Sequence, residues 1–179
     1  IGPITPTMKT LTEVEPRIAV DAVNTPGDAN SLYVISQPGS YYLKGNVTGE
    51  AGKNGIRITV DNVTLDLNGF SLIGVPGTLS GIQDSDLPPQ KGIAVMNGTV
   101  TGWDHDGIEL SNGVMSSVVS HIRSTHNGRH GFQLGSADSA IECFASFNGA
   151  SGFNSSSGIA FTGCIANNNP AGFITNDNS

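Results

Sequence analysis

Three stretches of this sequence decide its fold: STHNGRHGFQL (124–134), ASFNGASGFNS (145–155) and ANNNPAGFITN (166–176). Asparagine recurs every 21 residues, at Asn127, Asn148 and Asn169. Each copy also contains a Gly-Phe step, with its phenylalanine at 132, 153 and 173. Several columns that repeat in one register indicate a solenoid, in which each repeat forms one coil.

A period near 21 residues fits either leucine-rich repeats or a parallel β-helix. Leucine-rich repeats need several leucines and room for a helix in each copy, whereas these copies hold short alternating runs such as AIECFAS (140–146). At about 3.3 Å per residue, 21 residues give a coil of about 70 Å perimeter, enough for three short strands. The sequence therefore predicts an all-β protein, a right-handed parallel β-helix with coils of about 21 residues.

Composition supports this fold class and excludes several functions. Gly accounts for 24 of 179 residues, charged residues for 13% and aromatic residues for 6%, which favours strands and tight turns. The net charge is −7, and no basic cluster is interleaved with aromatic residues, so nucleic acid is not expected as a partner. No apolar run is long enough to insert into a membrane, and no motif calls for a cofactor.

Each repeated column has a predicted structural role. Phe132, Phe153 and Phe173, preceded by Ile108, are expected to stack in the interior, and earlier Gly-Ile steps at 55–56 and 92–93 extend the pattern. The asparagines are expected to form a turn ladder, because stacked Asn amides can hydrogen-bond along the axis.

A further column contains both cysteines of the chain, Cys143 and Cys164. On adjacent coils their Cα atoms would lie about 5 Å apart, a separation that permits a disulfide. The favoured interpretation is two small buried apolar side chains in an interior ladder, with a disulfide as the alternative. Both interpretations remain open on the sequence alone.

The first part of the chain does not repeat. We expect an extended N-terminal arm over residues 1–20, an N-terminal cap over 21–53 and β-helix coils over 54–179, with a protruding loop at 73–91 rich in Gly and Pro.

Three stretches of the first half carry a family resemblance: PTMKTLTEVEPR (6–17), ISQPGSYYLKGNVTG (35–49) and DNVTLDLNGFSLIGVPG (61–77). Together they resemble the opening of a group of bacterial secreted right-handed parallel β-helix proteins of the pectate-lyase-like superfamily. The resemblance implies the fold and export to the cell surface or beyond. It implies no reaction, because that group has no assigned catalytic motif.

The best local candidate for chemistry is TGWDHDGIE (101–109). Asp104 and Asp106 could supply the two carboxylates that polysaccharide hydrolysis requires. Trp103 could stack on a sugar ring, with His105 and Glu109 as further ligand-binding residues. The favoured interpretation, however, is a simple turn, since Asp favours turns, and the sequence then predicts no catalytic residue. No metal site is predicted, because no stretch supplies the ligands that calcium or zinc needs.

Arg129 and His130 lie within NGRHGF (127–132), and one coil later the equivalent residues are Ala150 and Ser151. The sequence thus predicts that both are outward decoration on a turn. As a whole it predicts an exported structural or adhesive surface protein that self-associates end to end, into filaments, through its solenoid ends and N-terminal arm. A polysaccharide-binding or polysaccharide-degrading protein is the alternative.

Overall fold

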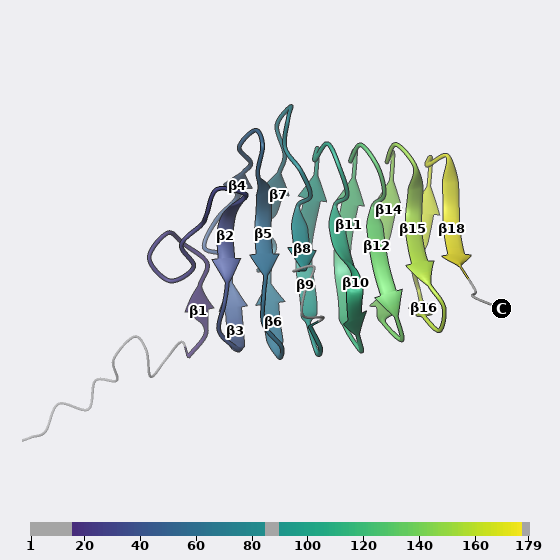
Figure 1. Ribbon diagram of the computed structural model, residues 1–179. Helices are drawn as coiled ribbons and strands as arrows, with labels where there is room; N and C mark the ends of the chain where they lie inside the picture. The colour runs from purple at the N-terminus through teal and green to yellow at the C-terminus, as the bar shows by residue number, and fades with distance from the viewer. Residues whose placement is uncertain (1–15, 85–89, 177–179) are drawn as a thin grey trace, which may run out of the picture.

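The computed structural model describes residues 16–84 and 90–176 of the chain. All regular structure in these ranges is β-strand, and the strands pair in parallel through about six stacked turns (Figure 1). The predicted all-β fold class, a parallel β-helix, is confirmed. Within the described ranges, no helix is long and apolar enough to cross a membrane.

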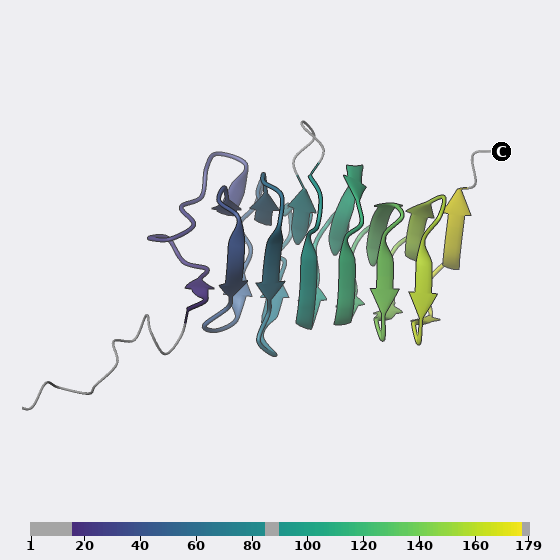
Figure 2. The ribbon, with the colours of Figure 1, turned by 90° about the horizontal axis from the view of Figure 1, so that it is seen from below.

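Two sheets run along the axis of the solenoid (Figure 2). The first, here called sheet B, takes one strand from each coil: β2 (Ser31–Ile35), β5 (Asn54–Ile58), β8 (Ile82–Asp84), β10 (Ile108–Met115), β12 (Phe132–Ser136), β15 (Ser151–Ser156) and β18 (Ala171–Asn176). The second, sheet A, contains β1 (Ile18–Ala19), β3 (Gly39–Tyr42), β4 (Val47–Thr48), β6 (Val63–Asp66), β7 (Ser71–Ile73), β9 (Ala94–Thr101), β11 (Val118–Thr125), β13 (Ser139–Ile141), β14 (Phe144–Ser146), β16 (Ala160–Thr162) and β17 (Ile165–Asn167).

Sheet A bends along one line, so each coil has three faces. At this line the backbone is left-handed in successive coils, at Asn97 (φ 60°), His121 (φ 54°), Glu142 (φ 50°) and Gly163 (φ 64°). β9 and β11 continue through the bend, whereas in the next two coils it separates β13 from β14 and β16 from β17. A single left-handed residue is enough to redirect an extended chain.

The 21-residue period holds only for the later coils. Hydrogen bonds between equivalent turn positions span 21 residues from Asn127 to Asn148 but 26 residues from Asn54 to Ser80. The interior column before Ile108 continues through Ile82 and Ile56, because β10 pairs with β8 and β8 with β5. Ile93, at the step expected to extend the column, lies just before β9 in sheet A.

The stretch 73–91, expected to protrude as a loop, contains β8. This strand lies between β5 and β10 in sheet B, and its Ile82 is fully buried. Gly81 precedes Ile82 as Gly107 precedes Ile108, so the Gly-Ile step is present there too. Residues 85–89, within the same stretch, lie outside the described ranges.

Stacked apolar side chains fill the interior. The ring centroids of Phe132 and Phe153 lie 4.7 Å apart, and those of Phe153 and Phe173 lie 4.8 Å apart, each pair nearly parallel. Phe161 meets Phe153 and Phe173 edge-on. Aromatic stacking adds to burial in stabilising such a column, and each coil buries its ring only against its neighbours.

The N-terminal end of the solenoid is covered by the chain itself. β1 pairs with the outer edge of β3. The segment 20–30 lies along β2, where Pro26 forms an antiparallel bridge with Tyr33 and the Val34 amide donates to the Thr25 carbonyl at 3.4 Å. Residues 31–48, within the range expected as a cap, already form a coil, since β2, β3 and β4 pair in register with β5, β6 and β7.

The opposite end differs. β16, β17 and β18 each pair with a strand on one side only among the described residues. Phe173 is 46% exposed, although Phe132 and Phe153 in the same column are fully buried. Figure 1 shows β18 as the last strand at this end, opposite β1.

Candidate functional site

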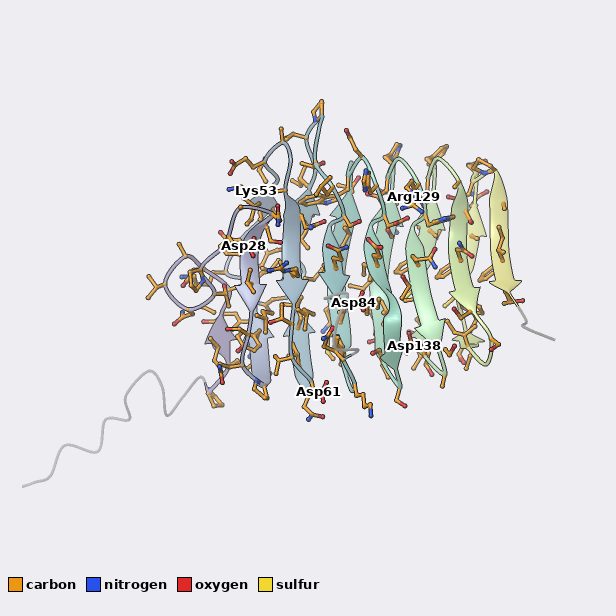
Figure 3. The ribbon with its side chains drawn as sticks, viewed as in Figure 1. Asp28, Lys53, Asp61, Asp84, Arg129 and Asp138 are labelled. Carbon is orange, nitrogen blue, oxygen red and sulfur yellow. The ribbon has the colours of Figure 1, made fainter. Side chains whose placement is uncertain are left out.

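Four ionisable side chains from neighbouring coils meet beside the start of the sheet B strands. They are Asp106, Glu109, Arg129 and His130, and we call them the ionic cluster. Asp106 lies in the turn before β10, Glu109 on β10, and Arg129 and His130 in the turn before β12. Figure 3 shows Arg129 at this turn, near the start of β12.

Asp106 anchors the cluster from within the turn. Its side chain is fully buried, and its Oδ1 accepts a hydrogen bond from the His130 amide at 2.9 Å. Its Oδ2 lies 3.2 Å from Nη1 of Arg129, an ion pair whose geometry is not that of a hydrogen bond. The Arg129 side chain is 54% exposed, so water partly screens this pair from the Arg129 side. Asp106 thus joins two consecutive turns.

Glu109 is the partly buried acid of the cluster. Its Oε2 accepts a hydrogen bond from the Ser80 hydroxyl at 2.8 Å, one coil back. Burial raises the pKa of Glu109, with a further rise from the charge of Asp106, while the Ser80 hydrogen bond and the charges of Arg129 and His105 oppose the shift. The carboxyl therefore stays protonated to a higher pH than an exposed glutamate would.

His130 is held by the following coil. Its Nδ1 lies 2.7 Å from the Ser151 hydroxyl and its Nε2 lies 3.3 Å from Nδ2 of Asn154. Asn154 also donates to Oε1 of Gln133 at 2.8 Å. Burial lowers the pKa of His130, Arg129 lowers it further, and the charge of Asp106 opposes the shift. The Ser151 amide also lies 3.3 Å from Nδ1, and since N–H groups can only donate, at least one ring nitrogen must accept, which only a neutral imidazole can do.

The structure corrects the prediction that Arg129 and His130 are decoration. Both interact with neighbouring coils through side-chain contacts, although the next copy of the repeat replaces them with Ala150 and Ser151. Sequence reasoning missed the cluster because Asp106 and His130 are 24 residues apart and meet only through stacking. The one available signal was that two ionisable pairs, His105–Asp106 and Arg129–His130, occupy equivalent positions in the turns of successive coils.

The predicted sugar-binding tryptophan lies in the interior. Trp103 is only 1% exposed, and its Nε1 donates to the Leu72 carbonyl at 3.3 Å. Its ring occupies space beside Gly49 and Gly55, where added Cβ atoms would touch it at 3.0 Å or less. A buried ring cannot stack on a sugar that arrives from solvent, so Trp103 serves the core.

The two acids predicted as a catalytic pair, Asp104 and Asp106, differ in their exposure to solvent. Asp104 is exposed, and its Oδ2 accepts a hydrogen bond from the Gly77 amide at 2.7 Å. Asp106 is fully buried. Hydrolysis needs two carboxyl groups that both reach one substrate, and this geometry does not provide that with Asp104 and Asp106. The exposed His105 is fixed through its backbone, since its amide donates to the Leu79 carbonyl and its carbonyl accepts from Arg129.

The three repeated asparagines form a continuous ladder along the turns that precede β12, β15 and β18. Asn148 Oδ1 accepts from both the backbone amide and the side-chain amide of Asn127, at 3.1 and 3.0 Å. Asn169 Oδ1 accepts in the same way from Asn148, both at 3.0 Å. Asn127 in turn accepts from the Trp103 amide at 3.1 Å. The ladder satisfies backbone donors of the turns that no strand partner reaches.

The two cysteines lie at equivalent positions of neighbouring coils, at the bends between β13 and β14 and between β16 and β17. Both are free thiols, Cys143 buried and Cys164 partly exposed. Across residues 16–84 and 90–176, no three His, Cys, Asp or Glu side chains are grouped so that they could hold a metal ion.

No family model, no curated protein and no solved structure matches this chain. Membership of the pectate-lyase-like superfamily therefore stays a prediction, and the parallel β-solenoid fold stands on the structure itself.

Proposed function

We propose that this chain is an exported structural module that associates end to end through the edge formed by β16, β17 and β18. The observation that supports this most strongly is the exposure of Phe173, 46% on an interior column whose other phenylalanines are fully buried. An exposed strand edge offers backbone donors and acceptors to another chain, and an exposed core ring adds apolar area to cover.

The charge of this region favours a second copy of the chain as the partner. No charged residue occurs from Cys143 to Asn176, although the whole chain carries a net charge of −7. Two copies of this face can therefore approach each other without the like-charge repulsion that the rest of the surface would produce.

The covered N-terminal end sets the symmetry of the contact. Since β1 and the segment 20–30 lie over the edges of β3 and β2, the C-terminal edge of one copy would meet the same edge of another. Such a contact is two-fold symmetric and pairs the strands antiparallel. Growth into filaments needs a second contact, which the sequence assigns to the N-terminal arm. Residues 1–15 of that arm lie outside the described ranges.

The test is a matched pair of charge insertions, one at each end. Ile174 is 37% exposed on the edge strand β18, and Val23 is 87% exposed at the covered end. Light scattering after gel filtration, over a range of protein concentrations, should show wild-type dimers, Val23→Lys dimers and Ile174→Lys monomers. Wild-type monomers throughout, or dissociation by Val23→Lys instead, would refute the proposed contact.

We infer a second candidate function, binding of a polysaccharide, from the ionic cluster. Glu109, Gln133 and Asn154 occupy one row across three neighbouring strands of sheet B, since β10, β12 and β15 pair in register. Together with His130 they present hydroxyl-binding groups on the outer face. Because Asp106 is buried, the arrangement favours binding over cleavage.

This candidate has its own test. Wild-type protein, Glu109→Gln and Gln83→Ala, a neighbour in the same row, would be titrated with a panel of plant and algal polysaccharides by calorimetry. Binding that weakens at least about tenfold in Glu109→Gln and little in Gln83→Ala would support the cluster as a glycan site. Absence of binding to every polysaccharide, or equal binding by all three proteins, would reject it.

A further inference from the structure

The two thiols occupy the same rung of neighbouring coils. Ile141 pairs with Thr162 before them and Phe144 pairs with Ile165 after them. The Ile165 amide also donates to the Cys143 carbonyl at 2.9 Å. Adjacent parallel strands lie about 4.8 Å apart, which falls within the range of Cα separations that disulfides span.

Their side chains point in the same direction. Sγ of Cys143 donates to the Val119 carbonyl at 3.4 Å, and Sγ of Cys164 donates to the Ala140 carbonyl at 3.2 Å. Both acceptors lie one coil back and are aligned with each other in the sheet. Equivalent strand positions and equivalent acceptors therefore place the two thiol groups side by side.

Their environments give them different reactivities. Cys143 is 1% exposed, and Cys164 is partly exposed. The neighbouring Cys143 thiol lowers the pKa of Cys164, whereas the Cys164 thiol and burial raise the pKa of Cys143. The thiolate is the reactive form of cysteine, so Cys164 would react first and Cys143 second.

We propose that Cys143 and Cys164 form a redox-active pair that closes to a disulfide between the two coils by exchange with a small-molecule disulfide such as oxidised glutathione. The Cys164 thiolate attacks one sulfur of that disulfide, forms a mixed disulfide and releases one thiolate. Cys143 then loses its proton to solvent and attacks Sγ of Cys164, which releases the second thiolate. The cysteine pair gives up two electrons, and the external disulfide becomes two thiols.

The covalent link would join the coil of β13 and β14 to that of β16 and β17, whose outer edge is open among the described residues. The proposal does not depend on the proposed self-association, because both cysteines belong to one chain. It predicts an oxidised form in which the last coils cannot separate.

The test begins with the reduced full-length chain in glutathione buffers of increasing oxidised fraction, quenched with an alkylating reagent. No Lys or Arg lies between the two cysteines, whereas Phe144, Phe147, Phe153 and Phe161 do. Chymotrypsin therefore separates the two cysteines where trypsin cannot. Mass spectrometry should then show a Cys143–Cys164 linked pair of peptides. The oxidised whole chain should carry no alkyl group and be two hydrogen atoms lighter than the reduced chain before alkylation.

Two single variants test the order of the steps. Cys143→Ser should stop at the mixed disulfide and carry glutathione on Cys164, because the resolving thiol is absent. Cys164→Ser should carry at least about tenfold less glutathione under the same conditions, since Cys143 is buried. Two free thiols in wild type at the most oxidising ratio, disulfides only between chains, or equal modification of both variants would overturn the proposal.

Discussion

Asp138 is the residue at which burial has the clearest consequence for stability. It is 2% exposed in the turn between β12 and β13 (Figure 3). Its two carboxylate oxygens accept hydrogen bonds from the Ser117 amide at 2.8 Å and the Gly135 amide at 2.9 Å. Burial nevertheless raises the pKa of Asp138 from 3.8 to about 6, because the two hydrogen bonds only partly offset it.

A raised pKa in the folded state makes stability depend on pH in a defined direction. The folded chain holds the Asp138 proton more tightly than the unfolded chain, so this stabilisation is present below about pH 4 and is lost as pH rises to about 6. Its size is about 1–3 kcal/mol. Between pH 4 and pH 7, the free energy of unfolding of wild type should fall by that amount relative to the free energy of unfolding of Asp138→Asn. Urea unfolding of both proteins at the two pH values measures this difference. An equal change in both proteins would contradict the assignment.

Residue-scale chemistry could be predicted only where the sequence repeats. A ladder is predicted at Asn127, Asn148 and Asn169 because the same residue recurs at the same spacing. The ionic cluster could not be found in this way. Asp106 and Arg129 lie on different coils, and the equivalent residues one coil later, His130 and Ala150, are of other types, so only the three-dimensional stack brings them together.

At the scale of the element, the turn between sheets A and B depends on close backbone approach. Gly149 follows the ladder residue Asn148, and its amide donates to the Asn127 carbonyl at 2.8 Å. A Cβ atom at Gly149 would overlap the carbonyl of Gly128 in the preceding coil, which is backbone and cannot rotate away. The repeated Asn-Gly step is therefore a packing requirement between coils.

Gly149→Ala should lower the free energy of unfolding by about 2 kcal/mol or more, because the coils must separate to admit the methyl group. The matched control is Gly45→Ala, where no atom lies within 4 Å of the added Cβ. Its effect should stay within about 0.5 kcal/mol. Chemical denaturation of the two variants measures the difference, and equal stabilities would show that the turn tolerates a side chain.

Element boundaries were predictable in the later coils and less so in the earlier ones. From Asn127 onward the spacing is 21 residues, which aligns the columns in the sequence itself. From Asn54 to Ser80, just before β8, the equivalent spacing is 26 residues, and the additional residues include Gly and Pro, which obscure the strand pattern. Stacking preserves the register of Ile56, Ile82 and Ile108, which are 26 residues apart, just as it preserves that of Phe132 and Phe153, which are 21 apart.

At the scale of the whole molecule, the two ends of the solenoid are different surfaces. One is closed by β1 and the segment 20–30, and the other presents β16, β17 and β18 with Phe173 partly exposed. A solenoid adds coils by pairing one strand edge with the next. In the proposed association, this pairing geometry would continue from the edge of β16, β17 and β18 into another copy of the chain.

Amide hydrogen exchange as a function of protein concentration tests this pairing most directly. Amides at the free edge of β18 (171–176) should exchange freely at low concentration and become protected as concentration rises, while exchange in β2 (31–35) stays constant. Concentration-independent exchange in β18, or protection that develops at residues 20–30 instead, would contradict association through the C-terminal edge.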